Sequence, residues 1–298
     1  MNLEIALCAD GNMEETLHVA SSSVLARVAP GRTTVFHLIL SGFTVAQKDL
    51  LRRTLDQVGR PYQINFITPP DEYRFRGFHP LHGNLVTYYR LVLPELVDAD
   101  DRLLYLDSDT ISYMDVSPLM EVPMPYACGF VERGVVSHYP EYPFFSRLGL
   151  GPETLAFNAG VMLFDLKTWR AEDRTRQLLD FCRKYSRDLY SSDQTALIAH
   201  CGGKFTRLEQ RFNMHLYVND RAQDPELNPG IYHFVGSPKP WDLAGRYLHG
   251  NFSLYQRAVT ATSFQRHRSE IGNMAAWKRA FRIRGGYMKS IRNRLTRP

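Results

Sequence analysis

Two aspartates separated by one residue directly follow a short apolar stretch. Asp107 and Asp109 flank Ser108 immediately after residues 103–106. In an extended chain, side chains two residues apart point the same way, so both carboxylates can face one ion. Hard divalent cations such as Mg²⁺ and Mn²⁺ prefer carboxylate oxygens and often share them with substrate phosphates. A solvated turn after a strand explains the same tripeptide equally well, because aspartate is common in turns.

A histidine and a lysine late in the chain could complete such a site. His233 lies in the apolar stretch 231–235, and Lys239 follows it closely. Two aspartates and an imidazole with open coordination positions suit Mn²⁺, and Mg²⁺ is also compatible. The ion would act as a Lewis acid on substrate phosphates, and the lysine would add a point charge beside a phosphate. Taken alone, a structural histidine and a solvated lysine are the more ordinary interpretations.

The elements around these residues predict an α/β fold. Apolar strand patterns cover residues 3–8, 33–40, 63–67 and 102–106, and helical patterns cover 14–29, 44–59 and 85–96, with Thr44 as the expected cap of the second helix. This alternation predicts a doubly wound, mostly parallel, Rossmann-like sheet. Ligands of such sheets bind beyond the carboxyl ends of the strands. Asp10 and Asn12 follow the first strand, so we expect them beside the same crevice as Asp107.

The second half of the chain continues less regularly. Further strands are predicted at 126–131, 157–166 and 231–235, and helices at 167–185 and 193–200. Between them, residues 133–151 are rich in proline, tyrosine and phenylalanine, which predicts a long loop that forms an acceptor wall or a lid. Ordinary packing accounts for these aromatic rings about as well.

Several short motifs, taken in order, carry a family resemblance. They are 9–12 (ADGN), 88–90 (YYR), 107–109 (DSD), 157–166 (FNAGVMLFDL), 192–194 (SDQ) and 233–241 (HFVGSPKPW). Over about residues 3–242 the chain resembles the family-eight glycosyltransferases, which include bacterial lipopolysaccharide galactosyl- and glucosyltransferases. The resemblance implies a GT-A type fold, a UDP-galactose or UDP-glucose donor, Mn²⁺ or Mg²⁺, and a glycan or glycolipid acceptor such as a lipopolysaccharide or lipooligosaccharide core.

The same resemblance implies roles for individual residues. The metal ligands are Asp107, Asp109 and His233. Donor binding falls to Asp10, Asn12, Arg90, Asp107, Ser108, Asn158, Ala159, Gly236 and Lys239. Asp193 and Gln194 would lie beneath the anomeric carbon, whose configuration the family retains. Because an amide is a poor nucleophile, we favour a front-face reaction in which the carbonyl of Gln194 faces the oxocarbenium-like centre, over covalent attack.

Three positions depart from the family pattern. Met13 replaces a tyrosine that stacks on uracil, so the base contact changes. Phe130 stands where relatives carry an aspartate near donor and acceptor, and the first acid after it is Glu132. Thr195 replaces an acid that commonly follows the glutamine. These changes leave the choice of sugar and of acceptor open.

Length and cysteine content limit the organisation of the protein. The 298 residues, 44% of them hydrophobic, are enough for one large domain, predicted at 1–250, followed by a helical, basic segment at 251–298. Neither a signal peptide nor a transmembrane helix is predicted. Four scattered cysteines without a C-x-x-C spacing indicate free thiols in a reducing compartment, so the protein is predicted to be cytoplasmic.

The basic charge is concentrated at the C-terminal end. Residues 277–298 hold eight lysines and arginines and no acid, which exceeds the net charge of +5, so the rest of the chain is slightly acidic. Aromatic and apolar residues among these charges predict that 274–298 binds an anionic membrane surface, peripherally on its inner face. We expect no nucleic-acid partner.

Two other functions are compatible with parts of this sequence. A sugar-phosphate nucleotidyltransferase shares the sheet and the carboxylate site, but it would need a glycine-rich basic loop after the first strand, and 9–12 is not one. A non-catalytic protein that binds membrane or nucleic acid through its basic tail is the second alternative. The preserved Asp107, Asp109, His233 and Lys239 argue against it.

Overall fold

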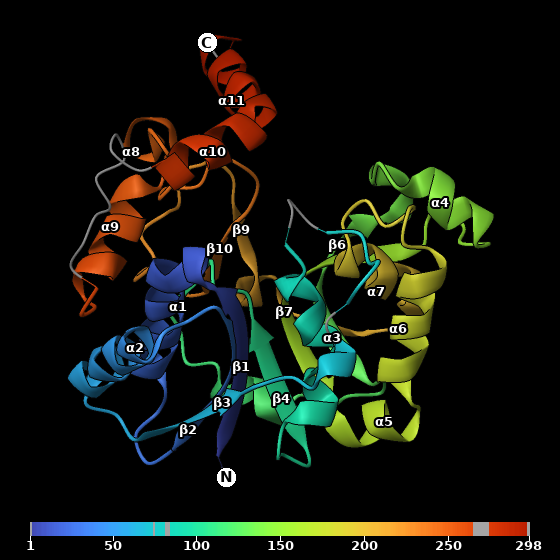
Figure 1. Ribbon diagram of the computed structural model, residues 1–298, viewed down its shortest axis with the longest axis horizontal. Helices are drawn as coiled ribbons and strands as arrows, with labels where there is room; N and C mark the ends of the chain where they lie inside the picture. Colours follow the sequence, from blue (N-terminus) through green and yellow to red (C-terminus); the bar gives the residue numbers. More distant parts are fainter. Residues whose placement is uncertain (1, 74, 81–83, 265–273, 297–298) are drawn as a thin grey trace.

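A seven-stranded sheet forms the centre of the protein. The computed structural model describes residues 2–73, 75–80, 84–264 and 274–296. The strand order is β3-β2-β1-β4-β7-β6-β8 (Figure 1). All neighbours run parallel except β7, which is antiparallel to both β4 and β6. The strands are β1 Leu3–Asp10, β2 Thr34–Ser41, β3 Tyr62–Ile67, β4 Arg102–Leu106, β6 Cys128–Val135, β7 Leu155–Asp165 and β8 Thr206–Leu208.

Helices cover both faces of this sheet, because successive strand residues point to opposite sides. Leu104 faces the core that contains α1 (Glu14–Arg27) and α2 (Val45–Val58). Tyr105 faces the other core, which contains the helices of the opposite layer. Those helices are α3 Tyr89–Leu96, α5 Leu166–Ala171, α6 Arg174–Lys184 and α7 Asp193–Cys201. The predicted doubly wound, mostly parallel sheet is therefore confirmed.

A small second sheet carries the late histidine. Its order is β5-β10-β9, with β5 Thr110–Ser112, β9 Met214–Leu216 and β10 Ile231–Phe234. His233 of β10 pairs with Thr110 of β5, the residue that follows Asp109. This antiparallel pairing brings a histidine from the end of the chain next to the two aspartates.

Most elements predicted for residues 3–106 lie where the sequence placed them. Strand and helix ends agree within two residues, and Thr44 caps α2 with a capping box to Gln47, as predicted. The exception is the helix predicted from residue 85, which begins with a separate 3-10 turn, Val86–Tyr88, before α3.

Two predictions for the second half of the chain are wrong. The single helix predicted at 167–185 divides into α5 and α6, because Asp173 adopts a left-handed conformation with φ 52° between them. The segment 133–151 is not one loop: β6 continues to Val135, and a short helix, α4, spans Tyr142–Arg147.

The C-terminal part is helical and packs on the body of the protein. It contains α8 Gly245–Leu248, α9 Phe252–Thr260, α10 Met274–Arg282 and α11 Arg284–Thr296. The hydroxyl of Tyr255 on α9 donates to Glu15 of α1 over 2.6 Å. Figure 1 shows α10 above β9 and β10, with α11 leading away to the C-terminus. Among the described residues, no helix is both long and apolar enough to cross a membrane.

Candidate active site

A cavity of about 680 Å³ lies at the carboxyl ends of β1 and β4. Its volume suits a ligand of nucleotide size, since small-molecule sites usually enclose roughly 300–1,000 Å³. Twelve of the thirteen site residues predicted from the sequence line it: Asp10, Asn12, Arg90, Asp107, Ser108, Asp109, Asn158, Asp193, Gln194, His233, Gly236 and Lys239. Ala159 lies next to the cavity and contacts two of its residues through its backbone.

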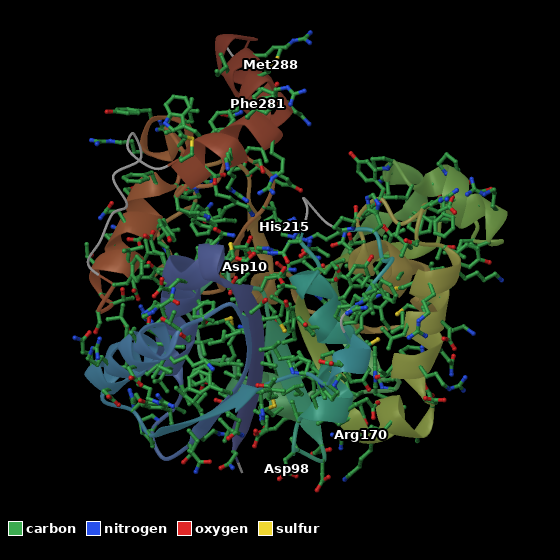
Figure 2. The ribbon with its side chains drawn as sticks, viewed as in Figure 1. Asp10, Asp98, Arg170, His215, Phe281 and Met288 are labelled. Carbon is green, nitrogen blue, oxygen red and sulfur yellow. The ribbon has the colours of Figure 1, made fainter. Side chains whose placement is uncertain are left out.

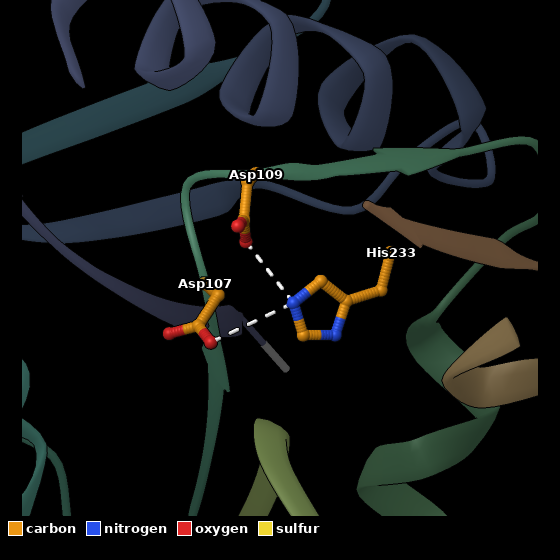
Figure 3. A group of neighbouring side chains, drawn as sticks. All are labelled: Asp107, Asp109 and His233. Carbon is orange, nitrogen blue, oxygen red and sulfur yellow. Dashed lines mark ion pairs between the residues drawn. The ribbon is translucent and has the colours of Figure 1, made fainter. Parts of the chain in front are cut away.

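Asp107, Asp109 and His233 converge on one point of this cavity (Figure 3). His233 Nε2 lies 3.1 Å from Asp109 Oδ1 and 3.8 Å from Asp107 Oδ2. One ligand atom from each residue lies within 4.8 Å of the other two. Two carboxylate oxygens and an imidazole nitrogen at this spacing form a donor set that Mn²⁺ or Mg²⁺ can use.

The hydrogen bonding of His233 fits a metal ligand. Asn213 donates through Nδ2 to Asn158 Oδ1 over 3.0 Å, so its own Oδ1 faces His233 Nδ1, also at 3.0 Å. His233 therefore donates from Nδ1, which leaves Nε2, the nitrogen that faces the carboxylates, as the one available to a metal ion. Such an outer partner commonly fixes the tautomer of a metal-binding histidine. Asn213 was not predicted from the sequence, because it belongs to none of the motifs.

Gly160 on β7 makes room for this group. A Cβ atom at this position would lie 2.2 Å from His233 Cε1 and 2.8 Å from Asp107 Oδ2. The backbone oxygen of Gly160 also accepts a hydrogen bond of 2.7 Å from the amide of Asp107. Any larger residue would therefore displace two of the three candidate ligands.

Lys239 adds a positive charge beside the aspartates. Its Nζ lies 2.7 Å from Asp109 Oδ2 and also contacts the backbone oxygen of Phe234. Burial alone would raise the pKa of Asp109, but Lys239 and His233 outweigh it and hold that pKa well below its usual range. Asp109 is thus a carboxylate, as cation binding requires.

Arg90 connects the candidate metal ligands to the predicted catalytic residues. Its buried guanidinium pairs with Asp107 Oδ1 and with Asp193 Oδ2, each over 2.9 Å, and donates to the Ala159 backbone oxygen over 2.5 Å. Burial raises the pKa of Asp193 even though Arg90 opposes that shift. Tyr105 donates a further hydrogen bond of 2.6 Å to Asp107 Oδ1. Arg90 therefore fixes both carboxylates, in a buried ion-pair network.

Gln194 is held by its carbonyl oxygen. Oε1 accepts hydrogen bonds from the Ala159 backbone amide over 3.1 Å and from Asn158 Nδ2 over 3.0 Å. The backbone donor determines which end of the side-chain amide faces β7. Both lone pairs of the oxygen are used, so the geometry differs from our expectation of a carbonyl that faces the sugar.

Asp10 and Asn12 line the cavity where β1 ends. Asp10 Oδ1 accepts from the Asn12 backbone amide over 2.9 Å, and its Oδ2 accepts from the side chain of Asn84. Asn84, which also lines the cavity, was not singled out in the sequence. It lies between the strand predicted at 63–67 and the helix predicted at 85–96, outside every motif named in the sequence.

Comparison with known families identifies this constellation. The sequence profile of glycosyl transferase family 8 matches residues 4–244, which contain all the residues described above. The protein belongs to glycosyl transferase family 8. The predicted family resemblance is therefore confirmed.

Individual members of the family differ considerably from this chain. It is 25% identical over 257 residues to general stress protein A of Bacillus subtilis, covering 80% of this chain and 87% of that protein. It is 24% identical over 183 residues to a lipopolysaccharide 1,3-galactosyltransferase of Salmonella typhimurium, covering 58% of this chain and 54% of that protein.

A solved family structure has the same fold. The galactosyltransferase LgtC, in complex with donor and acceptor sugar analogues, superposes with a TM-score of 0.69 at 25% identity. The match covers 87% of this chain and 96% of that one. The predicted GT-A type architecture of this family-eight protein is confirmed.

The structure accounts for two of the three departures from the family pattern. Phe130 is fully buried and stacks on Phe157, with ring centroids 3.7 Å apart, so it belongs to the core. Thr195 replaces an acid of the family pattern, and a different acid lies beside it here. The Thr195 hydroxyl donates to the buried carboxylate of Glu141 over 3.1 Å. Glu141 also accepts from Ser191 over 2.6 Å. The third departure, Met13, lines the cavity beside Asn12.

Proposed function

We propose that this family-eight protein is a metal-dependent, retaining α-glycosyltransferase that uses UDP-galactose or UDP-glucose. The observation that carries this proposal is the convergence of Asp107, Asp109 and His233 in a cavity that also contains Lys239. A divalent ion bound there would act as a Lewis acid on the diphosphate of the donor. Mn²⁺ suits the mixed oxygen and nitrogen ligands, and Mg²⁺ is the alternative.

The protein's own residues would divide the remaining tasks. Lys239 would bind a phosphate oxygen of the donor. Asp10 and Asn12, which line the cavity where β1 ends, would bind the uridine, and Ser108 and Gly236 would line the path between them. Asn158 would bind sugar hydroxyls, beside the backbone of Ala159.

Asp193 and Gln194 are the proposed catalytic residues. With its carbonyl engaged by β7, Gln194 would turn its amide Nε2 toward the sugar and donate a hydrogen bond there. We favour front-face transfer, in which the departing diphosphate takes the proton of the acceptor hydroxyl. Arg90 would keep Asp193 in place through their 2.9 Å ion pair.

The proposed acceptor is a glycan or glycolipid, with a lipopolysaccharide or lipooligosaccharide core as the first candidate. Supporting this, one relative is a lipopolysaccharide galactosyltransferase. Family membership argues against a nucleotidyltransferase, and the intact ligand set argues against a protein without activity.

We further propose that the protein works in the cytoplasm, bound peripherally to the inner face of the membrane. All four cysteines are free and buried, which suits a reducing compartment. Met274, Trp277, Phe281 and Met288 on α10 and α11 expose between 52% and 71% of their surface among basic residues. Such a surface suits anionic lipid headgroups.

A donor panel tests the proposed activity. UDP release from each nucleotide sugar is measured with Mn²⁺, with Mg²⁺ and with a chelator, for the wild type and for Asp109→Asn. We expect slow hydrolysis of one UDP-hexose that the chelator and the substitution both abolish. Asp98→Asn is the matched control, because Asp98 is exposed at the opposite end of the sheet (Figure 2). Metal-independent release, or full activity of Asp109→Asn, would contradict the proposal.

A further inference from the structure

The helix α10 forms part of the wall of the donor cavity. Ala276, Arg279 and Arg282 line the cavity, although they lie more than thirty residues beyond the family match, which ends at residue 244. Their spacing of three residues places them on one face of the helix. The C-terminal segment, which the sequence suggested only as a membrane anchor, thus also faces the candidate active site.

Arg279 on this face binds the loop that carries Lys239. Its Nε pairs with Asp242 Oδ1 over 2.5 Å, and only 2% of the Asp242 side chain is exposed. Asp242 Oδ2 accepts a hydrogen bond of 2.7 Å from the Lys239 backbone amide. In return, the Asp242 amide donates to the Lys239 backbone oxygen over 3.1 Å. The carboxylate therefore joins α10 directly to the backbone of the lysine.

The following helix contacts the same loop at two other points. A Cβ atom at Gly286 of α11 would lie 2.8 Å from the Ser237 backbone oxygen, so this glycine permits close packing. Tyr287 donates from its hydroxyl to the Leu243 backbone oxygen over 2.6 Å. The loop of residues 237–243 thus contacts α10 and α11 at both of its ends.

We propose that Arg279 is a positioning residue of the donor site, acting on Lys239 through Asp242. This inference rests on the proposed role of Lys239 at the donor phosphates. Arg279 neutralises a carboxylate that is otherwise almost completely buried. Without its partner, that carboxylate would favour an exposed position, because an unpaired buried charge is costly. Movement of Asp242 would release the Lys239 backbone and shift Nζ away from Asp109.

The test compares UDP binding in the presence of Mn²⁺, measured by calorimetry on the full-length protein. We expect Arg279→Met to weaken UDP binding by about tenfold, which corresponds to about 1.4 kcal/mol. Arg279→Lys should restore most of the affinity, because it keeps the charge. Arg183→Met is the matched control: Arg183 forms a 2.7 Å ion pair with Asp180 on the surface of α6 and does not line the cavity.

Asp242→Asn provides a second variant, since it can still accept from the Lys239 amide but lacks the charge. If the two residues act as one unit, Arg279→Met combined with Asp242→Asn should lose no more affinity than the larger single effect. If Arg279→Met binds UDP as tightly as the wild type, the positioning role of Arg279 is wrong, while the proposed function is unaffected. Failure of the wild type to bind UDP would instead contradict the proposed function.

Discussion

Several polar side chains of the candidate site are fixed by partners that are neither candidate metal ligands nor proposed catalytic residues. Asn213 sets the tautomer of His233, Arg90 and Tyr105 hold Asp107, and the backbone of Ala159 holds Gln194. Such preorganisation lets electrostatic groups act without reorganising during the reaction. The site therefore depends on residues that would not be chosen for their own reactivity.

Gln194 offers the sharpest test at the residue scale. Because its Oε1 is already bound, we expect Nε2 to supply the functional contact. Gln194→Glu keeps an oxygen for Ala159 and Asn158 but loses the donor, whereas Gln194→Ala loses both. We predict that both lower kcat by about 10²-fold, as for other single donors in active sites, with smaller effects on the donor KM.

The measurement is steady-state transfer or donor hydrolysis over a range of UDP-sugar concentrations. High activity of Gln194→Glu beside inactive Gln194→Ala would instead indicate that the carbonyl faces the reacting carbon. An effect of Gln194→Ala on KM alone would make the residue a binding residue. Leu227→Ser, at an 85% exposed position, is a suitable control for the measurement.

The sequence could predict the residues that lie in compact motifs. Asp107 and Asp109 stand at a spacing that lets both face one ion, and His233 and Lys239 could be recognised through the motif at 233–241 that carries the family resemblance. Asn213, Asn84 and Glu141 could not be, because each is isolated in the sequence and reaches the site only through tertiary contacts.

At the scale of elements, the layer of α1 and α2 contains an unusual buried histidine. His18 on α1 is 0% exposed, and its Nδ1 lies 2.7 Å from Thr54 Oγ1 on α2. Burial lowers the pKa of His18 to about 4. The folded protein therefore favours the neutral imidazole at this position.

This pKa predicts a loss of stability in mild acid. His18 takes up a proton near pH 6.5 in the unfolded chain but only near pH 4 in the folded chain. Between these two pH values the unfolded state therefore binds more protons than the folded state. From pH 7.5 to pH 5, His18 should lower the free energy of unfolding by about 2 kcal/mol. Urea unfolding at both values should show this loss, and His18→Asn should remove it.

The exposed residue His79 provides the control, because His79→Asn should leave the pH dependence as in the wild type. If His18→Asn loses as much stability between the two pH values as the wild type does, the prediction is wrong.

Elements were predictable where local patterns determine them. Capping and periodicity located α2 correctly, but local sequence could not reveal that β7 runs antiparallel or that β10 belongs to a second sheet. Strand direction depends on which distant strands pair. The break at Asp173 was missed because a left-handed conformation is uncommon for any residue other than glycine, and the helical pattern continues across it.

On the scale of the whole molecule, the C-terminal helices have two faces with different contacts. One face of α10 lines the cavity, and Arg279 binds Asp242. Elsewhere on α10 and α11, Phe281 and Met288 are each 71% exposed, and Figure 2 shows them on the outer part of the molecule, far from Asp98 and Arg170. Membrane binding and donor binding would therefore use the same two helices.

This arrangement predicts that the two activities can be separated by point substitutions but not by truncation. Phe281→Ser combined with Met288→Ser should weaken binding to anionic vesicles by about tenfold, because two apolar side chains no longer enter the interface. UDP affinity should stay unchanged, since neither residue lines the cavity. Deletion of residues 274–298 should impair both, because it also removes Arg279.

Co-sedimentation with vesicles of anionic and of neutral lipid, together with UDP calorimetry, measures both properties on the same preparations. Raising the salt concentration should weaken binding of the wild type to anionic vesicles, because salt screens the attraction between the basic residues and the lipid headgroups. Leu227→Ser serves as the control for an exposed apolar residue outside α10 and α11. Vesicle binding that survives the double substitution would exclude this surface as the anchor. Full UDP affinity in the truncated protein would show instead that the loop of residues 237–243 holds Lys239 without the C-terminal helices.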